Sequence, residues 1–488
     1  MVALPSYNDG SAPLARDAGS TLAEQLAQRF AERIGQRLMP PGARLPSVRD
    51  CAQRHRVSPS TVVGAYDLLQ AQGLVEARPQ RGFFVRGVRP GSAAPAAATL
   101  RAGTPRPPAP VPVDATALIR SMFQVRGGPL SPGMGTLPED WLDAGLLQRA
   151  LRRAAGPASA QAWLRYGDPA GHPGLRAALS RRIADLGLAA APEQIITTVG
   201  ATHALDIVSR TLVQPGDAVL VDEPGWAVEF ARLTRLGLRL LPVPRRADGP
   251  DLAVMAALLR EHRPRLYVTV SVLHNPTGNS LSAAAAHQVL LLAEQHGLQI
   301  VEDDTYAWLA PPHATRLAQL DGLHRTIYVS GFSKILTPQW RVGFIAAPPA
   351  LVERFVDTKL LASLTTPSPL EEALAWCLDQ GALRRHAERV VARLDAARSR
   401  TVRLVGEAGF RFETPPRGLF GWVDVGRDTD GLAQQLLDEG WLIAPGSLFH
   451  AVPRPSTCMR VNFAAGQDAR FWRRLRDLVG DLPRTDRS

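Results

Sequence analysis

Apolar residues recur at every fourth position near the start of the chain, and this spacing predicts an amphipathic helix. The positions concerned are Leu22, Leu26, Phe30, Ile34 and Leu38. Thr21 and Glu24 have the spacing of a capping box, in which each side chain binds the backbone N–H of the other residue. The first helix is therefore expected to begin at these two residues.

Two further helices and two short strands are expected before residue 90. The second helix starts at Ser47, and the third has Ser58 as its N-cap with Pro59 at its first helical position. The third helix ends at Gly73, and the segments "LVEA" and "GFFVR" then flank the basic turn "RPQR" at 78–81. Three helices followed by a basic hairpin are typical of a winged helix-turn-helix.

A proline-rich segment separates this module from the rest of the chain. Residues 90–112, "PGSAAPAAATLRAGTPRPPAPVP", contain seven prolines and almost nothing that builds a core. Such a composition is typical of an extended, semi-stiff linker. We therefore expect a winged module at 15–89, a linker at 90–117 and a body at 118–484.

Apolar, β-rich runs alternate with helical stretches in the body, which predicts an α/β fold with a largely parallel sheet covered by helices. The runs are "QIITTV", "AVLVDE", "LRLLPV", "RLYVTVSV", "LQIVED", "TIYVSG" and "GFIAAP". After about residue 350 long helical patterns precede the strands "GWVDV" and "CMRVNF". The body should thus have a large part at about 155–345 and a smaller α+β part at about 346–484.

The net charge, the cysteine count and the lengths of the apolar runs exclude some classes of protein and favour others. A net charge of +11 and a pI near 10.4 suit a polyanionic partner, although a biased genome also gives an arginine-rich chain. The three cysteines are far apart, so neither a disulfide framework nor a metal site is expected. No leader and no apolar run long enough for a membrane span is visible, which favours the cytoplasm.

Lysine is rare enough to draw attention to one position. Of the 56 basic side chains 54 are arginine, and only Lys334 and Lys359 are lysine. Lys334 follows a predicted strand in "SGFSK", and four other polar segments also follow strands: "GATHA", "DEPGW", "HNPTG" and "EDDTY". Ligands of parallel sheets bind beyond the carboxyl ends of the strands, so these five segments should converge.

The side chains in these segments suit pyridoxal phosphate (PLP). Lys334 can form a Schiff base with its aldehyde, whereas an arginine stays protonated and is a poor nucleophile. Asp303 can pair with the ring nitrogen, and Asn275 and Tyr306 can donate hydrogen bonds to the ring oxygen. The phosphate suits the helix N-terminus at Ala201 and Thr202 together with Arg341, and Trp226 can stack on the ring.

The order and spacing of "HNPTG", "DDTY" and "SK" followed by Arg341 resemble the aminotransferases of fold type I over essentially the whole body. The resemblance implies the cofactor roles just given, with Ser330 or Ser333 supplying a phosphate hydroxyl because Gly331 stands at the usual position. His203 stands where a glutamine is common. The resemblance also implies a homodimer, in which Tyr166 reaches the neighbouring subunit's phosphate and Arg460 binds a substrate carboxylate.

The front module resembles the winged-helix domain of the GntR regulators, which matches "GARLPSVRDCA" and "VSPSTVVGAYDLLQAQGL" in this chain. Residues 1–90 hold 12 arginines against 7 acidic residues, an excess that favours double-stranded DNA. Arg54 and Arg56 are expected to be solvated surface charges. Contacts with bases or phosphates are expected from the second and third helices and from the hairpin, at Arg44, Ser47, Arg49, Ser58, Ser60, Thr61, Arg78 and Arg81.

A GntR module joined by a proline-rich linker to an aminotransferase-like body is similar to the MocR subfamily. The resemblance implies a transcriptional regulator that senses an amine, an amino acid or PLP itself through aldimine chemistry at Lys334. Two alternatives stay open: a genuine PLP-dependent aminotransferase that carries a DNA-binding module, and a scaffold that has lost cofactor chemistry.

Overall fold

The computed structural model describes residues 20–35, 39, 42–78, 81–86, 131–156 and 162–480. These residues form two compact units. The first contains the N-terminal module together with 428–448 and 453–456, and the second contains the remaining part of the body. The expected linker at 90–117 lies outside the described residues.

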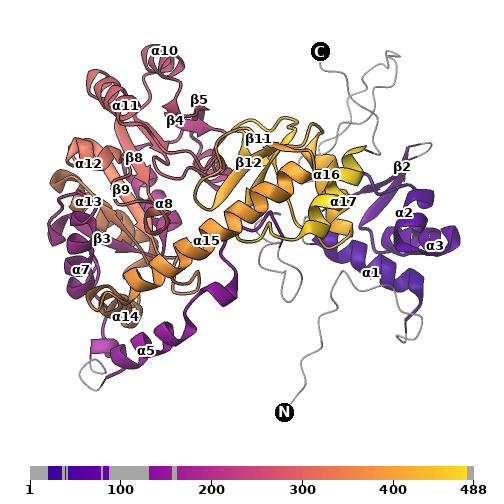
Figure 1. The fold of residues 1–488 in the computed structure, drawn as a ribbon, viewed down its shortest axis with the longest axis horizontal. Coiled ribbons are helices and arrows are strands. Elements are labelled where there is room, and N and C mark those ends of the chain that lie inside the picture. The colour runs from indigo at the N-terminus through magenta and orange to yellow at the C-terminus, as the bar shows by residue number, and fades with distance from the viewer. Residues whose placement is uncertain are drawn as a thin grey trace, which may run out of the picture. The chain divides into compact units, whose positions relative to one another are not determined.

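The N-terminal module is a winged helix, as expected. Its elements are α1 (Leu22–Gly35), α2 (Val48–His55), α3 (Pro59–Ala71), β1 (Val75–Arg78) and β2 (Gly82–Val85) (Figure 1). The capping box forms, because Thr21 N donates to Glu24 at 2.7 Å and Glu24 N donates to the Thr21 hydroxyl at 3.2 Å. The two strands pair antiparallel, with Val75 opposite Val85.

One apolar core holds the three helices of the module against its hairpin. Leu26 and Phe30 of α1 are buried against Tyr66 of α3, whose ring meets the Phe30 ring edge-on at 5.7 Å. The Tyr66 hydroxyl donates to the Pro46 carbonyl at 2.9 Å, so the buried polar atom of this ring is satisfied. The four-residue period of apolar positions along α1 thus has a direct cause in packing.

The large part of the body is built on an eight-stranded sheet with the strand order β3-β10-β9-β8-β7-β4-β5-β6. All neighbouring pairs from β9 to β5 are parallel, whereas β10 runs antiparallel to both β3 and β9. β3 therefore points the same way as β9. The strands are β3 (Ile195–Thr198), β4 (Ala218–Glu223), β5 (Arg239–Arg246), β6 (Gly249–Pro250), β7 (Leu266–Thr269), β8 (Gln299–Asp303), β9 (Thr326–Gly331) and β10 (Gly343–Ala346).

Helices cover both faces of this sheet, which explains why its strands are continuous apolar runs. Along β9, Ile327 and Val329 join one core cluster while Tyr328 between them joins another, as the two-residue period of a strand requires. The helices of the second unit are α5 (Ala144–Ala154), α7 (Pro173–Ala184), α8 (Ala201–Leu212), α9 (Ala227–Arg235), α10 (Leu252–His262), α11 (Ala283–His296), α12 (Leu317–Asp321), α13 (Pro349–Ser363), α14 (Ser368–Asp379), α15 (Ala382–Glu407) and α17 (Ala469–Gly480).

The expected smaller α+β part contains an antiparallel sheet. β12 (Phe420–Asp424) pairs with β11 (Arg411–Phe412) and with β14 (Cys458–Asn462), so that Trp422 lies opposite Arg460. Within the first unit lie α16 (Thr429–Asp438) and the short strand β13 (Ala444–Pro445). None of the described helices has the length and apolar character that crossing a bilayer requires.

Candidate functional site

Five loops meet at one edge of the large sheet, because the strands that precede them point in the same direction. The loops follow β3, β4, β7, β8 and β9, and they carry the polar segments singled out in the sequence. The convergence expected from the alternating pattern of strands and helices is therefore present.

Lys334 lies three residues beyond β9, and its ammonium group is held inside the protein. Its Nζ donates a hydrogen bond to the Gly135 carbonyl at 2.7 Å. The pKa of Lys334 is lowered to about 8, mainly by burial and also by the nearby cations Arg460 and Arg341, while Asp303 opposes these effects. A lysine with this pKa has an appreciable fraction of free amine near neutral pH, which an attack on a carbonyl requires.

Of the three consecutive acids at the end of β8, only Asp303 faces this group. Glu302 binds the first N–H groups of α12, at Leu317 (2.7 Å) and Ala318 (2.8 Å). Asp304 pairs with the buried Arg316 at 2.6 Å. Alternation along the strand therefore sends the acids that flank Asp303 to structural partners.

Within the described residues, one oxygen of the Asp303 carboxylate accepts hydrogen bonds and the other accepts none. Oδ1 accepts from the backbone N–H of Thr305 at 3.0 Å and from the Thr305 hydroxyl at 2.5 Å. Among the described residues no hydrogen bond reaches Oδ2. Burial raises the pKa of Asp303 to about 6, the Thr305 hydrogen bonds lower it, and the charge of Glu229 raises it.

Asn275, Tyr306 and Arg460 form the second wall of the site. Arg460 Nη1 donates to Asn275 Oδ1 at 3.2 Å, and Asn275 also hydrogen-bonds the Tyr306 hydroxyl. Burial raises the pKa of Tyr306, so this phenol stays protonated. The three side chains come from the loop after β7, the loop after β8 and strand β14.

Arg460 is a buried cation without an acidic partner among the described residues. Its side chain is only 4% exposed, Nη2 donates to the Gly133 carbonyl at 2.8 Å, and Nε has no hydrogen bond. Its guanidinium lies 4.4 Å from the centre of the Phe420 ring and 5.4 Å from that of Phe449. Burial lowers the pKa of Arg460 to about 10, so it remains a cation at neutral pH. Such an uncompensated charge suits an anionic ligand.

Glycines make room for Arg341 and for the first turn of α8. A Cβ at Gly200, whose φ is +78°, would lie 2.5 Å from Arg341 Nη2. A Cβ at Gly343 would lie 2.7 Å from the Ala201 nitrogen. The N–H groups of Ala201 and Thr202 have no acceptor within the described part of the chain. This cradle of free N–H groups beside an arginine suits a phosphate.

The other residues expected to bind the cofactor do not all lie in this cluster with groups available for a ligand. Trp226 lines one small cavity with Asp303. The Ser330 hydroxyl is already committed, because it donates to the Asp304 carbonyl at 2.8 Å, whereas Ser333 is half-buried with no such bond among the described residues. Tyr166 is 83% exposed, so within its own chain it does not join the cluster.

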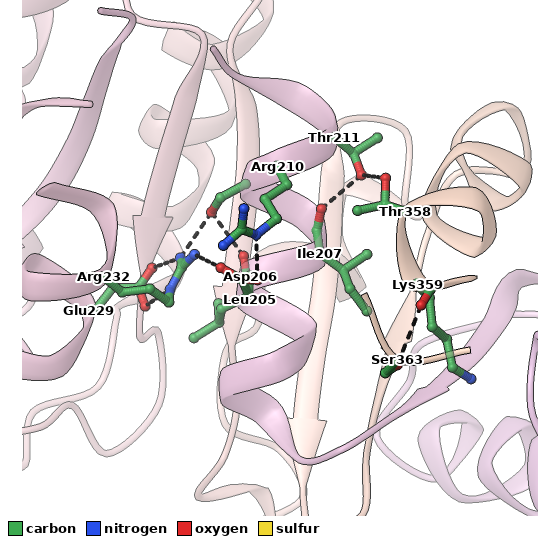
Figure 2. Close-up of polar contacts among 11 residues, drawn as sticks. Leu205, Asp206, Ile207, Arg210, Thr211, Glu229, Arg232, Thr358, Lys359 and Ser363 are labelled. Carbon is green, nitrogen blue, oxygen red and sulfur yellow. Dashed lines mark hydrogen bonds and ion pairs between the residues drawn. The ribbon is translucent and has the colours of Figure 1, made fainter. Parts of the chain in front are cut away.

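Sequence reasoning missed the carbonyls of Gly133 and Gly135, which bind Arg460 and Lys334. These loop carbonyls carry no side-chain signal, and the only cue was the glycine-rich segment "SPGMG". The other lysine is more deeply buried. Lys359 of α13 is 0% exposed, and its carbonyl accepts from the Ser363 hydroxyl at 3.4 Å (Figure 2). Its Nζ lies 3.5 Å from the Thr197 hydroxyl, and burial lowers its pKa to about 8.

In the winged module, the expected DNA-contacting residues surround the ends of α2 and α3 and the hairpin. Ser47 and Ser58 are N-caps that accept from Asp50 N and Thr61 N, and Ser58 also shares hydrogen bonds with the Ser60 and Thr61 hydroxyls. Their hydroxyls therefore already have partners. Four arginines have exposed side chains: Arg44, Arg49, Arg78 and Arg81. Of these, Arg78 lies 4.5 Å from the Phe84 ring centre and pairs with Glu76 at 2.8 Å.

Arg54 is exposed, as expected, and it also takes part in an ion pair that the sequence did not indicate. Within the first unit its Nη1 pairs with Asp438 at the end of α16 at 3.2 Å, and Arg33 of α1 pairs with the same carboxylate. Arg33 also donates to the Leu437 carbonyl at 3.4 Å. The Asp438 side chain is 14% exposed, so α1, α2 and the last turn of α16 share a half-buried ion cluster. Arg56 stays exposed, as expected.

An α/β body with a lysine, an aspartate, an asparagine and two arginines gathered at one sheet edge defines an aminotransferase-like protein of fold type I. Residues 133–476 match the family described as "Aminotransferase class I and II", and residues 22–85 match "Bacterial regulatory proteins, gntR family". The chain therefore belongs to the aminotransferase class I and II family and carries a GntR module, the arrangement of the MocR-type regulators.

Relatives with the same two-part arrangement support this assignment. The chain is 30% identical to an uncharacterized HTH-type transcriptional regulator of Escherichia coli (strain K12), YdcR, with 87% of this chain and 91% of that protein covered. It is 32% identical to the probable rhizopine catabolism regulatory protein MocR of Rhizobium meliloti, over 71% and 69% of the two chains.

A solved structure supports the fold of the body. LysN, an α-aminoadipate aminotransferase from Thermus thermophilus, superposes with a TM-score of 0.68 and 25% identity over 74% of this chain and 95% of its own. That protein was crystallised with N-(5'-phosphopyridoxyl)-L-leucine.

The residues of this chain fit the cofactor that the family implies. The available oxygen of Asp303 suits the ring nitrogen of PLP, and the lowered pKa of Lys334 suits its aldehyde. The N–H groups of the first turn of α8, beside Gly200 and Gly343, suit its phosphate. Each group has the chemistry that its expected partner needs.

Proposed function

We propose that this protein is a transcriptional regulator that binds double-stranded DNA through its winged module and binds PLP together with an amino acid in its body. The observation that carries the proposal is Arg460, a buried cation without an acidic partner in the described part of the chain, beside a lysine whose pKa is lowered to about 8. A ligand with both a carboxylate and an amine satisfies this pair.

Bound PLP supplies an aldehyde that reacts with amines and a ring that withdraws electrons from the carbon attached to them. The chain's own groups then have separate tasks. Lys334 supplies the covalent anchor, and Asp303 holds a proton at the ring nitrogen. Asn275 and Tyr306 donate to the ring oxygen, while Arg341 and the first turn of α8 bind the phosphate.

The ligand's carboxylate would bind Arg460 in place of solvent. The Nε–H group has no partner within the described residues, and a carboxylate is the acceptor that a guanidinium binds best. Phe420 and Phe449 beside the guanidinium exclude water from the same position, which strengthens the interaction. We therefore favour amino acids over simple amines and over PLP alone as the signal.

Communication with the DNA-binding module is proposed to use the ion cluster at Asp438. α16 belongs to the range matched by the aminotransferase family, whereas Arg33 and Arg54 belong to the GntR range, yet they form one compact unit. A ligand that changes the position of α16 would act on α1 and α2 through these pairs. It shifts the balance only by its difference in affinity for the two arrangements.

A homodimer is part of the proposal, and Tyr166 supports it. This tyrosine is 83% exposed, and the turn that follows it is held by a hydrogen bond from Ala170 N to the Asp168 side chain at 2.8 Å. A large aromatic side chain held outward is typical of a residue that packs on a partner. In the proposed dimer it reaches the partner's phosphate site.

A genuine aminotransferase with a DNA-binding module is the second candidate, and one observation favours it. Lys334, Asp303 and Arg460 are all present and brought together, so no catalytic group of the family is missing. A relative named 2-aminoadipate transaminase, from Thermus thermophilus, is 29% identical over 62% of this chain and 77% of its own.

The deciding experiment is a spectral titration of the PLP-loaded protein with amino acids and with 2-oxo acids, in the presence and absence of DNA. A stable change in absorbance without turnover, together with a change in DNA affinity, is expected of a regulator. Continued conversion of a 2-oxo acid would establish the enzyme instead.

The Lys334→Ala variant separates the third possibility, in which cofactor chemistry has been lost. The wild type should form a borohydride-reducible adduct with PLP, and Lys334→Ala should form none while keeping its fold. If the wild type shows no lysine-dependent chromophore, the body is a scaffold.

A further inference from the structure

A second carboxylate lies on the same small cavity as Asp303. Glu229 belongs to the first turn of α9, three residues after Trp226, and is only 5% exposed. Glu229, Trp226 and Asp303 all line a cavity of about 30 Å³. Neither the sequence motifs nor the family resemblance assigns a role to this glutamate.

A chain of ion pairs connects Glu229 of α9 to α8. Its two oxygens accept from Arg232 Nε at 3.0 Å and from Arg232 Nη2 at 2.5 Å. Arg232 in turn donates to Ser209 at 2.9 Å and to Asp206 at 3.4 Å, and Asp206 accepts from Arg210 at 2.6 Å (Figure 2). Bidentate pairing of this kind fixes the orientation of the Glu229 carboxylate.

The other titratable groups on the cavity do not add charge toward Asp303. Asp222 is fully engaged, because it accepts from Arg245 (2.9 Å), Tyr267 (2.6 Å) and Thr269 (2.7 Å). His274 is neutral, since burial lowers its pKa to about 3. Besides Asp222, the cavity is therefore lined by two carboxylates, Asp303 and Glu229.

Arg232 offsets part of the negative charge of Glu229, and the remaining negative potential near Asp303 favours a positive charge on a group bound to Asp303. When a group that carries a proton binds to Asp303, a second carboxylate nearby makes the loss of that proton less favourable. Glu229 is this second carboxylate. The charge of Glu229 raises the pKa of Asp303. Burial, which raises this pKa, and the Thr305 hydroxyl, which lowers it, have larger effects.

We infer that Glu229 is a positioning residue that acts through Asp303 and keeps the ring nitrogen of the cofactor protonated. This inference rests on the proposed binding of PLP. The rival explanation is structural: Glu229, Arg232 and Asp206 join α9 to α8, so their loss would disturb Trp226 and the phosphate cradle together.

Two ligands distinguish these explanations. One is PLP, and the other is its carbon analogue, in which the ring nitrogen is replaced by C–H and nothing remains to be protonated. Glu229→Gln should weaken PLP binding by roughly three- to tenfold and leave the binding of the carbon analogue within about twofold, as expected for the loss of one nearby charge. Glu294→Gln, which neutralises an exposed glutamate of α11, is the matched control and should change neither affinity.

Asp206→Asn provides a second variant in case Glu229→Gln does not fold. It breaks the link to Arg232 at a partly exposed position but leaves the charge of Glu229. The preference of this variant for PLP over the carbon analogue should equal that of the wild type.

Three results would overturn the inference. Equal weakening of both ligands by Glu229→Gln would assign Glu229 to structure alone, and unchanged binding of both would remove it from the site. A reduced preference in Asp206→Asn would show that helix position, and not the charge, sets the discrimination. Wild-type protein that binds neither ligand at Lys334 would instead contradict the proposed function itself.

Discussion

Replacing Arg460 by methionine tests which chemical group of the ligand the body recognises. Methionine has a similar length and keeps the contact with Phe420, but it removes the buried guanidinium. If the ligand's carboxylate binds there, an amino acid should lose affinity and the matching amine without a carboxylate should not.

The expected loss follows from the surroundings of Arg460. Two of its N–H groups are already used by Asn275 and Gly133, and Nε is free, so a carboxylate gains a charge-assisted hydrogen bond and a close ion pair. Hydrogen bonds to charged groups contribute about 1.5–3 kcal/mol each. After the cost of desolvating the ligand, we expect a net loss of about 2–3 kcal/mol of binding free energy. This corresponds to a roughly 30- to 150-fold larger dissociation constant.

The assay is a spectral titration of the PLP-loaded variant with each amino acid that changes the wild-type spectrum, and with the amine that lacks only its carboxylate. Arg473→Met, at an exposed arginine of α17, is the control and should behave as the wild type. The free variant should be at least as stable as the wild type, because an uncompensated buried charge is removed. An equal loss of affinity for the amino acid and its amine would refute the assignment of Arg460.

Three other predictions concern Lys334, the hairpin and the ion cluster. Because only the free amine attacks an aldehyde and the pKa of Lys334 is lowered from the usual 10.5 to about 8, the rate of PLP adduct formation should rise with pH through about 8 and then level off; a rise that continues to pH 10 would contradict this. Arg81→Ala should reduce the slope of log affinity for DNA against log salt by about one unit, and an unchanged slope would remove Arg81 from the phosphate contacts. Asp438→Asn should reduce the effect of the amino acid on DNA affinity by roughly two- to fivefold, as expected for half-buried ion pairs; an unaltered effect would exclude this route of communication.

Sequence patterns predicted the elements of this protein well because the rules behind them are local. The capping box at Thr21 and the proline that opens α3 each depend on neighbours within four residues. The convergence of five loops followed from one rule about parallel strands. β6, with only two residues, gave no pattern and was missed.

The missed features depend on tertiary contacts. Asp303 was named through cofactor chemistry and the family resemblance, but the pattern "EDD" did not reveal that Glu302 and Asp304 have structural partners in α12 and Arg316. Glu229 resembles an ordinary helix acid until its burial beside Asp303 is known. The ion pair of the exposed Arg54 was not foreseen because its partner, Asp438, lies 384 residues away.

With only two lysines, of which Lys359 is buried and Lys334 half-buried, the protein should react selectively with reagents that attack amines. Lys359 is buried beside Thr197, and Lys334 lies within the site with its Nζ bound to the Gly135 carbonyl. Neither lysine side chain is therefore fully exposed to solvent. Carbonyl compounds and active esters usually react with many lysines of a protein, yet here Lys334 is the one lysine side chain that is not fully buried. A reducible probe aldehyde would thus report on one side chain without mutagenesis, and tryptic cleavage beside arginine would release the labelled peptide with its lysine intact.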